Sequence, residues 1–133
     1  YKHSNYYKAN ASEWKMELVC FQGMDKQNWA QINALIKRGD WSRVVLVKNK
    51  SADSIPLPEN CTTVSINSDA PLLELKDEII KKLKASLGKE FEVALSIASG
   101  SGKENMALIS ALLGIPVGIR LVAYTKKGVE FIN

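Results

Sequence analysis

Short apolar runs alternate along this chain with longer stretches whose apolar residues recur at helical spacing. The runs are rich in Val, Ile and Leu and predict strands over residues 16–21, 43–47, 62–66, 92–98, 119–124 and 129–132. Continuous runs such as Val44-Val45-Leu46-Val47 are typical of strands that are buried on both faces in a parallel sheet. The chain therefore has to place a covering layer on each side of its sheet.

The stretches between the runs supply that cover. They predict amphipathic helices over residues 26–38, 72–87 and 103–113, with Asp25 placed to cap the first. Strands and helices in this order, joined by right-handed crossovers, predict an α/β domain with three layers, of the Rossmann-like kind. Most of its sheet should be parallel, with residues 119–124 and 129–132 forming an antiparallel hairpin at the C-terminal edge.

The length of 133 residues favours one domain, which we expect over residues 16–133. Residues 1–15 are polar and aromatic and are interpreted as an N-terminal arm, either disordered or incomplete. The sequence has two cysteines, Cys20 and Cys61, which are too few for a disulfide framework and are not spaced as paired Cys-x-x-Cys metal ligands. We therefore expect two buried thiols in a reducing cytoplasm. No apolar run is long enough to predict a membrane span, and no metal site or cofactor is predicted.

A formal net charge of +4 favours polyanionic partners, but arginine occurs only at Arg38, Arg43 and Arg120. Without an arginine-rich tract, a surface for duplex DNA is not indicated. An anion site should therefore be local.

The most specific local feature is a glycine-rich turn, Ser99-Gly100-Ser101-Gly102-Lys103, which follows the fourth predicted strand and opens a helix. Glycines allow close approach of a ligand, and the amides and dipole of a helix N-terminus attract an anion. Lys103 adds a positive charge. The turn therefore predicts a site for a phosphate-bearing ligand, with a purely structural chain reversal as the alternative.

Two better-known phosphate-binding loops do not fit this turn. A Walker A loop needs a glycine where Ile97 stands and a Ser or Thr where Glu104 stands, so nucleotide triphosphate hydrolysis is not indicated. The dinucleotide fingerprint needs a third glycine where Asn105 stands, and it follows the first strand of its fold.

Residues 95–128 resemble the core of CRISPR-associated Rossmann-fold (CARF) domains. In that family a strand leads into a Ser-Gly-Gly-Thr-Lys-like turn, then into a helix that begins with methionine and small residues, then into a strand that closes on tyrosine. The positions that match this pattern are Ser99, Gly100, Lys103, Met106, Ala107 and Tyr124. Ser101 and Gly102 depart from it, standing in place of the second glycine and the threonine.

The resemblance implies a homodimer that senses a cyclic oligoadenylate or a related nucleotide at its interface. It implies that binding regulates either transcription or an effector that is absent from these residues. It implies ligand contacts by Ser99, Gly100, Ser101, Gly102, Lys103 and Asn105, completed by Gly23, Met24, Asp25 and Asn49. Two alternatives stay open. The chain is a phosphodiesterase that cleaves the ring at the same site, for which no catalytic residue can be assigned, or it is a subunit that only mediates interactions.

Overall fold

The computed structural model describes residues 16–53, 56–88 and 92–133, so the predicted arm over residues 1–15 lies outside the described residues. Its strands are β1 (Glu17–Gln22), β2 (Arg43–Asn49), β3 (Cys61–Ile66), β4 (Glu92–Ser96), β5 (Gly118–Thr125) and β6 (Gly128–Phe131). Its helices are a short 3-10 helix η1 (Lys26–Asn28) followed by α2 (Trp29–Arg38), α3 (Leu72–Ser86) and α4 (Gly102–Leu113). Each predicted element is present, with ends within two residues of the predicted bounds.

The strands form one sheet in the order β3-β2-β1-β4-β5-β6. Each neighbouring pair from β3 through β2, β1 and β4 to β5 is parallel, whereas β5 and β6 pair antiparallel. The predicted Rossmann-like sheet, mostly parallel with an antiparallel edge hairpin, is confirmed. Strands β2 and β3 lie in turn on one side of β1, and the later strands β4 and β5 lie in turn on its other side. The carboxyl ends of β1 and β4 therefore flank a topological switch point, the place where sheets of this type bind ligands.

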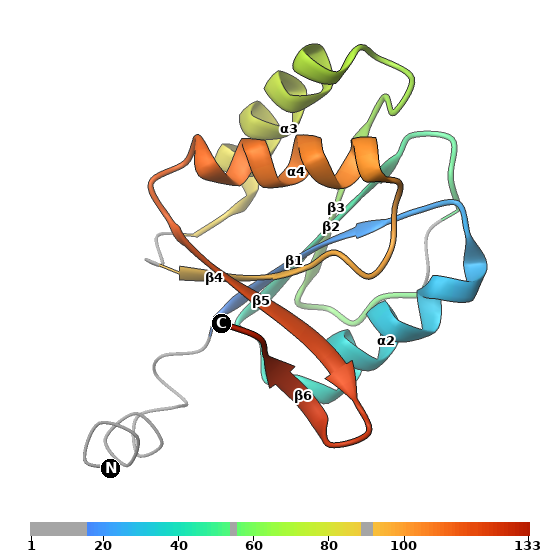
Figure 1. Cartoon of the computed structure of the whole chain (residues 1–133), viewed down its shortest axis with the longest axis vertical. Coiled ribbons are helices and arrows are strands. Elements are labelled where there is room, and N and C mark those ends of the chain that lie inside the picture. Colours follow the sequence, from blue (N-terminus) through green and yellow to red (C-terminus); the bar gives the residue numbers. More distant parts are fainter. Residues whose placement is uncertain (1–15, 54–55, 89–91) are drawn as a thin grey trace.

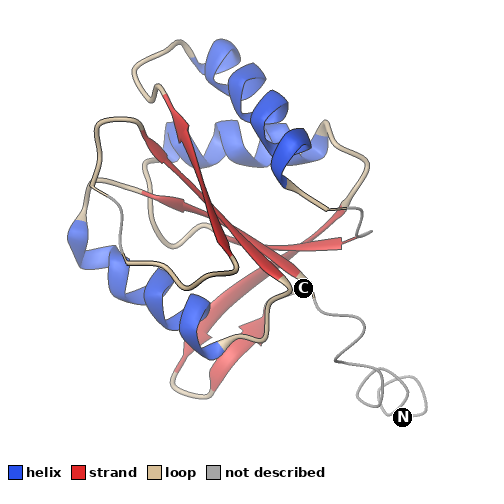
Figure 2. Ribbon diagram, turned by 180° about the vertical axis from the view of Figure 1, so that it is seen from behind, coloured by secondary structure: helices blue, strands red, loops and turns tan. Residues whose placement is uncertain are grey.

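Helices cover both faces of the sheet, α3 and α4 on one side and α2 on the other (Figures 1 and 2). The side chains of β1 alternate between the two cores, because successive residues of a strand point to opposite faces. Val19 and Phe21 join the core under α3 and α4, whereas Leu18 and Cys20 join the core under α2. All four are fully buried, which explains why this strand is apolar without interruption.

The two cysteines differ in their surroundings. Cys20 is fully buried, and that burial, with a smaller contribution from Cys61, raises the pKa of its thiol. Cys61 begins the edge strand β3 and is only partly buried, so the expectation of two buried thiols is right for Cys20 alone. Both are free thiols.

Candidate functional site

A pocket of about 490 Å³ opens at the carboxyl ends of β1, β2, β3 and β4. Its volume lies within the range of about 300–1,000 Å³ that is usual for small-molecule sites. The loops that follow these strands supply its lining, which consists of Met24, Asp25, Asn28, Asn49, Ser68, Asp69, Gly100, Ser101 and Glu104. The pocket thus lies at the switch point of the sheet.

The loops after β1 and β4 touch each other through Gly23 and Ser99, the residues that precede the lining residues Met24 and Gly100. The amide of Gly23 donates to the hydroxyl of Ser99 at 2.9 Å, and Ser99 is only 1% exposed. A Cβ atom on Gly23 would lie 2.6 Å from the backbone nitrogen of Gly100. Glycine is required at position 23 because the two backbones approach so closely.

The Trp29 indole holds the β1 loop from its other side, donating to the Gly23 carbonyl at 2.7 Å. Asp25 lies in the same loop, and its carboxylate accepts from the amide of Gln27. The predicted cap at Asp25 is confirmed, although the element it begins is the 3-10 helix η1. The conformation of this loop is therefore fixed by contacts within the protein.

The glycine-rich turn is also held by its own residues. Gly100 has a φ of 95°, a left-handed conformation that favours glycine. The Asn105 side chain donates to the Ser99 carbonyl at 3.0 Å. Ser101 and Glu104 form a capping box, in which the Ser101 hydroxyl accepts from the Glu104 amide and the Glu104 carboxylate accepts from the Ser101 amide.

Ser68, in the loop after β3, joins three parts of the pocket wall. Its amide donates to the side-chain oxygen of Asn49 at 3.0 Å, and its hydroxyl donates to the Glu104 carboxylate at 2.7 Å. Its carbonyl accepts from the Lys103 ammonium at 2.9 Å. The loops after β2 and β3 and the start of α4 are therefore connected through one residue.

The electrostatics of the pocket are mixed. Asp25, Asp69 and Glu104 bring carboxylates to its lining, and Glu104 is only 8% exposed. Lys103 lies beside the lining residue Ser68, to whose carbonyl it donates. The capping box leaves the amides of Gly102 and Lys103 without an intrahelical acceptor, as at any helix start. The wall is rich in acceptors, whereas donors are concentrated at the start of α4.

The residues predicted from the sequence to bind a ligand lie close together, but only some of them line the pocket. Met24, Asp25, Asn49, Gly100 and Ser101 line the pocket. Gly23 and Ser99 form the contact between the two loops next to these lining residues, and Asn105 supports the turn from α4. Gly102 is exposed at the first position of α4, with open space around it. The Ser99 hydroxyl is buried and accepts from the Gly23 amide, so it holds the two loops together.

The sequence interpretation missed Asn28, Ser68, Asp69 and Glu104 as lining residues. A signal for Glu104 was present, since Ser101-Gly-Lys-Glu104 has the Ser-x-x-Glu spacing of a capping box. Ser68 and Asp69 lie in the loop after β3, two and three residues past its end, and the carboxyl ends of parallel strands are where ligand-binding residues are expected.

Comparison with protein-family models finds no match, and no curated protein matches the chain. In the described part of the chain, no group of three or more His, Cys, Asp or Glu is placed to hold a metal ion. None of the helices within the described ranges has the length and apolar character needed to cross a membrane.

Proposed function

We propose that this chain is a CARF-like sensor module that binds a cyclic oligoadenylate, or a related nucleotide, in the pocket at the switch point of its sheet. One observation carries the proposal: the glycine-rich turn that resembles the family's motif lines that pocket and contacts the loop after β1, which lines it too. Ligand sites in open α/β sheets occur at this position.

The lining suits a nucleotide because a nucleotide both donates and accepts hydrogen bonds. Ribose hydroxyls and the adenine amino group are donors, and the carboxylates of Asp25 and Asp69 with the Asn49 amide offer acceptors. Phosphate needs donors, which the amide of Gly102 and the Lys103 ammonium supply at the start of α4. Met24 is 64% exposed at the pocket and provides an apolar contact for a base.

A cyclic oligoadenylate with an even number of units has two-fold symmetry. An isologous homodimer satisfies such a ligand with one set of contacts used twice. We therefore place one half of the ring in the pocket of each copy. The output passes to an effector outside this chain, or to transcription, and the module works in the cytoplasm.

Calorimetric titration with cyclic tetra-adenylate and cyclic hexa-adenylate tests the proposal. One ring per two chains is the expected stoichiometry. Chromatography of the ring after incubation separates the two ligand-based functions: an intact ring indicates a sensor, and linear products indicate a phosphodiesterase. Absence of heat and of any thermal shift with both rings would contradict the proposal.

Replacing Lys103 with methionine should weaken ring binding by roughly tenfold, which corresponds to about 1.4 kcal/mol. The change removes the ammonium beside the start of α4 while keeping most of the side chain. Binding of the unchanged protein should weaken as salt is raised, and the dependence should be shallower in the variant. The measurement is calorimetry at two salt concentrations.

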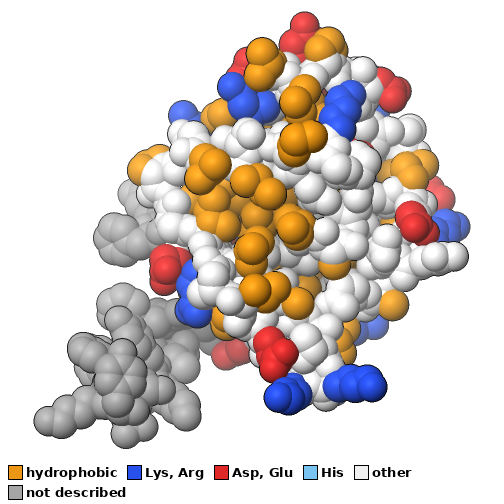
Figure 3. Space-filling model, viewed as in Figure 1, with side chains coloured by type: hydrophobic (Ala, Val, Ile, Leu, Met, Phe, Trp, Pro, Cys, Tyr) orange, Lys and Arg blue, Asp and Glu red, His pale blue; other side chains and the backbone are white. Residues whose placement is uncertain are grey.

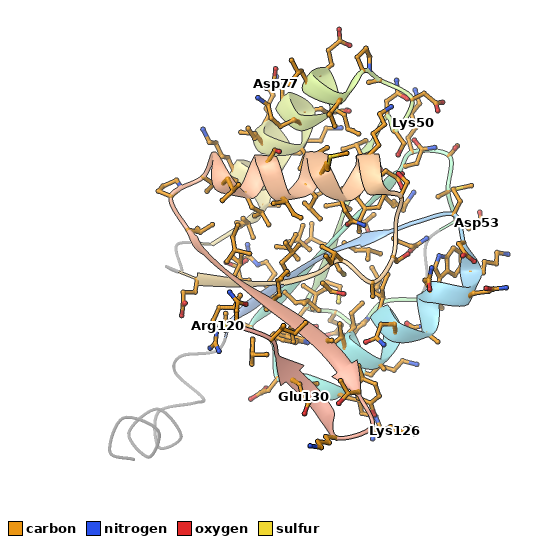
Figure 4. All side chains as sticks on the ribbon, in the orientation of Figure 1. Lys50, Asp53, Asp77, Arg120, Lys126 and Glu130 are labelled. Carbon is orange, nitrogen blue, oxygen red and sulfur yellow. The ribbon has the colours of Figure 1, made fainter. Side chains whose placement is uncertain are left out.

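Lys126→Met is the matched control for this prediction. Lys126 is exposed on the turn between β5 and β6, far from the loops that carry Lys50 and Asp53 (Figure 4). Lys126→Met lowers the net charge by the same amount as Lys103→Met, but it leaves the hydrogen bond from Lys103 to the Ser68 carbonyl in place. Equal affinities for Lys103→Met and Lys126→Met would show that the start of α4 does not contact the ring.

A further inference from the structure

A second pocket, the amino-end pocket, lies at the opposite end of the strands, where β2 and β3 begin. Its volume of about 540 Å³ is again usual for a small-molecule site. The start of β2, the start of β3 and the last turn of α3 line it, and every lining residue except Ala85 is polar or charged. Hydrophobic side chains gather elsewhere, over α4 and β5 (Figure 3). The amino-end pocket therefore suits a small polar ligand.

Arg43 is held at this pocket by contacts on two sides. Its Nη1 atom donates to the Ser86 carbonyl at 2.6 Å, at the end of α3. Its Nε atom lies 3.9 Å from the Oε2 atom of Glu17, whose buried carboxylate also accepts from the Gly88 amide. The Arg43 side chain is nevertheless 46% exposed, and its Nη2 atom has no hydrogen-bond partner among the described residues. Arg43 is thus positioned and keeps N–H donors for a carboxylate.

Glu59 lines the same pocket from the turn before β3. It is exposed, and it forms no ion pair with Arg43 or with any other residue in the described ranges. The turn that carries it is fixed to the start of β2, because the Val44 amide donates to the Asn60 carbonyl and the Asn60 side chain donates to the Trp41 carbonyl. Two opposite charges therefore line one pocket without contacting each other.

The end of α3 adds negative potential to the pocket. The last carbonyls of a helix lack intrahelical donors and attract cations, and Ala85 and Ser86 bring this helix end to the lining. Glu17 balances the charge of Arg43, so the remaining field near Glu59 favours an ammonium group. A dicarboxylate would be repelled by Glu59, and a diamine would be repelled by Arg43. A ligand with one charge of each sign avoids both repulsions.

We propose that the amino-end pocket binds a free α-amino acid, with its carboxylate at Arg43 and its ammonium group between Glu59 and the end of α3. The hydroxyl groups of Ser42 and Thr62 in the lining favour a neutral, polar side chain. Because both charged side chains are partly solvated, we expect weak binding, with a dissociation constant of about 1 mM. The inference does not depend on the proposed function, since the two pockets lie at opposite ends of the strands.

Calorimetric titration with L-glutamine and two analogues tests the inference. Glutaramate is glutamine without its ammonium group, and γ-aminobutyramide is glutamine without its carboxylate. L-glutamine should bind, and each analogue should bind roughly three- to tenfold more weakly, because each lacks one of the two charges. Absence of L-glutamine binding at millimolar concentration, or an analogue that binds as tightly as L-glutamine, would overturn the inference.

Glu59→Gln assigns the ammonium group to its partner. The variant should fold normally, because Glu59 is exposed and forms no ion pair within the described ranges. It should weaken L-glutamine binding roughly three- to tenfold and should not weaken glutaramate binding. Glu74→Gln is the matched control, since Glu74 is an exposed glutamate at the other end of α3 and its loss changes the net charge equally. Equal L-glutamine affinities for the two variants would contradict the role of Glu59.

Arg43→Gln tests the carboxylate end in the same way. It should weaken binding of L-glutamine but not of γ-aminobutyramide, which has no carboxylate to lose. Because Arg43 also contacts Ser86 and Glu17, thermal melting checks that the variant is folded at the titration temperature. A folded Arg43→Gln variant that binds L-glutamine as the unchanged protein does would overturn the proposed orientation. The Glu59→Gln titration stays decisive if this variant does not fold.

Discussion

Replacing Gly23 with alanine should lower the free energy of unfolding by about 1–3 kcal/mol, although it adds a single methyl group. The new Cβ would lie 2.6 Å from the nitrogen and 2.7 Å from the Cα of Gly100, and both are backbone atoms that cannot rotate away. The loops after β1 and β4 would have to separate, and the Gly23–Ser99 hydrogen bond would weaken. Because Gly23 and Ser99 precede the lining residues Met24 and Gly100, affinity for the proposed ligand should fall as well. Chemical denaturation measures the stability.

Gly102→Ala provides a control in the same turn. A Cβ on Gly102 meets no atom within 4 Å, and alanine favours a helical position over glycine by up to about 1 kcal/mol. This variant should be as stable as the unchanged protein or slightly more stable. If Gly23→Ala and Gly102→Ala unfolded at the same denaturant concentration, the close approach of the two loops would be wrong.

Replacing Glu104 with alanine should lower the free energy of unfolding by about 1–3 kcal/mol, comparable to the loss of a helix cap plus a buried hydrogen-bond partner. The carboxylate accepts from the Ser101 amide and from the Ser68 hydroxyl, so both donors would lose their partner. The connection between the β3 loop and α4 would then depend on Lys103 alone. Thermal melting and hydrogen exchange of the Ser101 amide measure these effects.

Glu104→Gln separates hydrogen bonding from charge. Glutamine completes a capping box as glutamate does, so this variant should keep most of the stability that alanine loses. It also removes a negative charge from the pocket lining, which should strengthen binding of an anionic ring. A Glu104→Gln variant as unstable as Glu104→Ala would contradict the role given to the hydrogen bonds.

The elements could be predicted from the sequence because their signals are local. A β-branched run such as Val44–Val47 and the stripe from Leu75 to Leu83 each indicate burial within a few residues. The strand order could not be predicted, since the pairing of β1 with β4 joins residues more than seventy positions apart, such as Glu17 and Val93. Nothing near Glu17 in the sequence specifies that neighbour.

The part of the candidate site that could be predicted is the part formed by loops directly after strands. Gly100 and Asp25 could be placed at the same edge of the sheet from the parallel fold alone. The role of Ser68 could not, because its three partners, Asn49, Lys103 and Glu104, are brought together only by the crossover from β3 through α3. A serine among polar loop residues carries no distinguishing pattern.

The arrangement around Ser68 has a consequence for synthesis of the protein. Ser68 is made well before residues 101–104, so during translation a nascent chain holds the first three strands while one wall of the cavity does not yet exist. Recognition of a small molecule should therefore begin only once α4 has left the exit tunnel and docked. No amino-terminal fragment that stops before α4 should respond to the ligand.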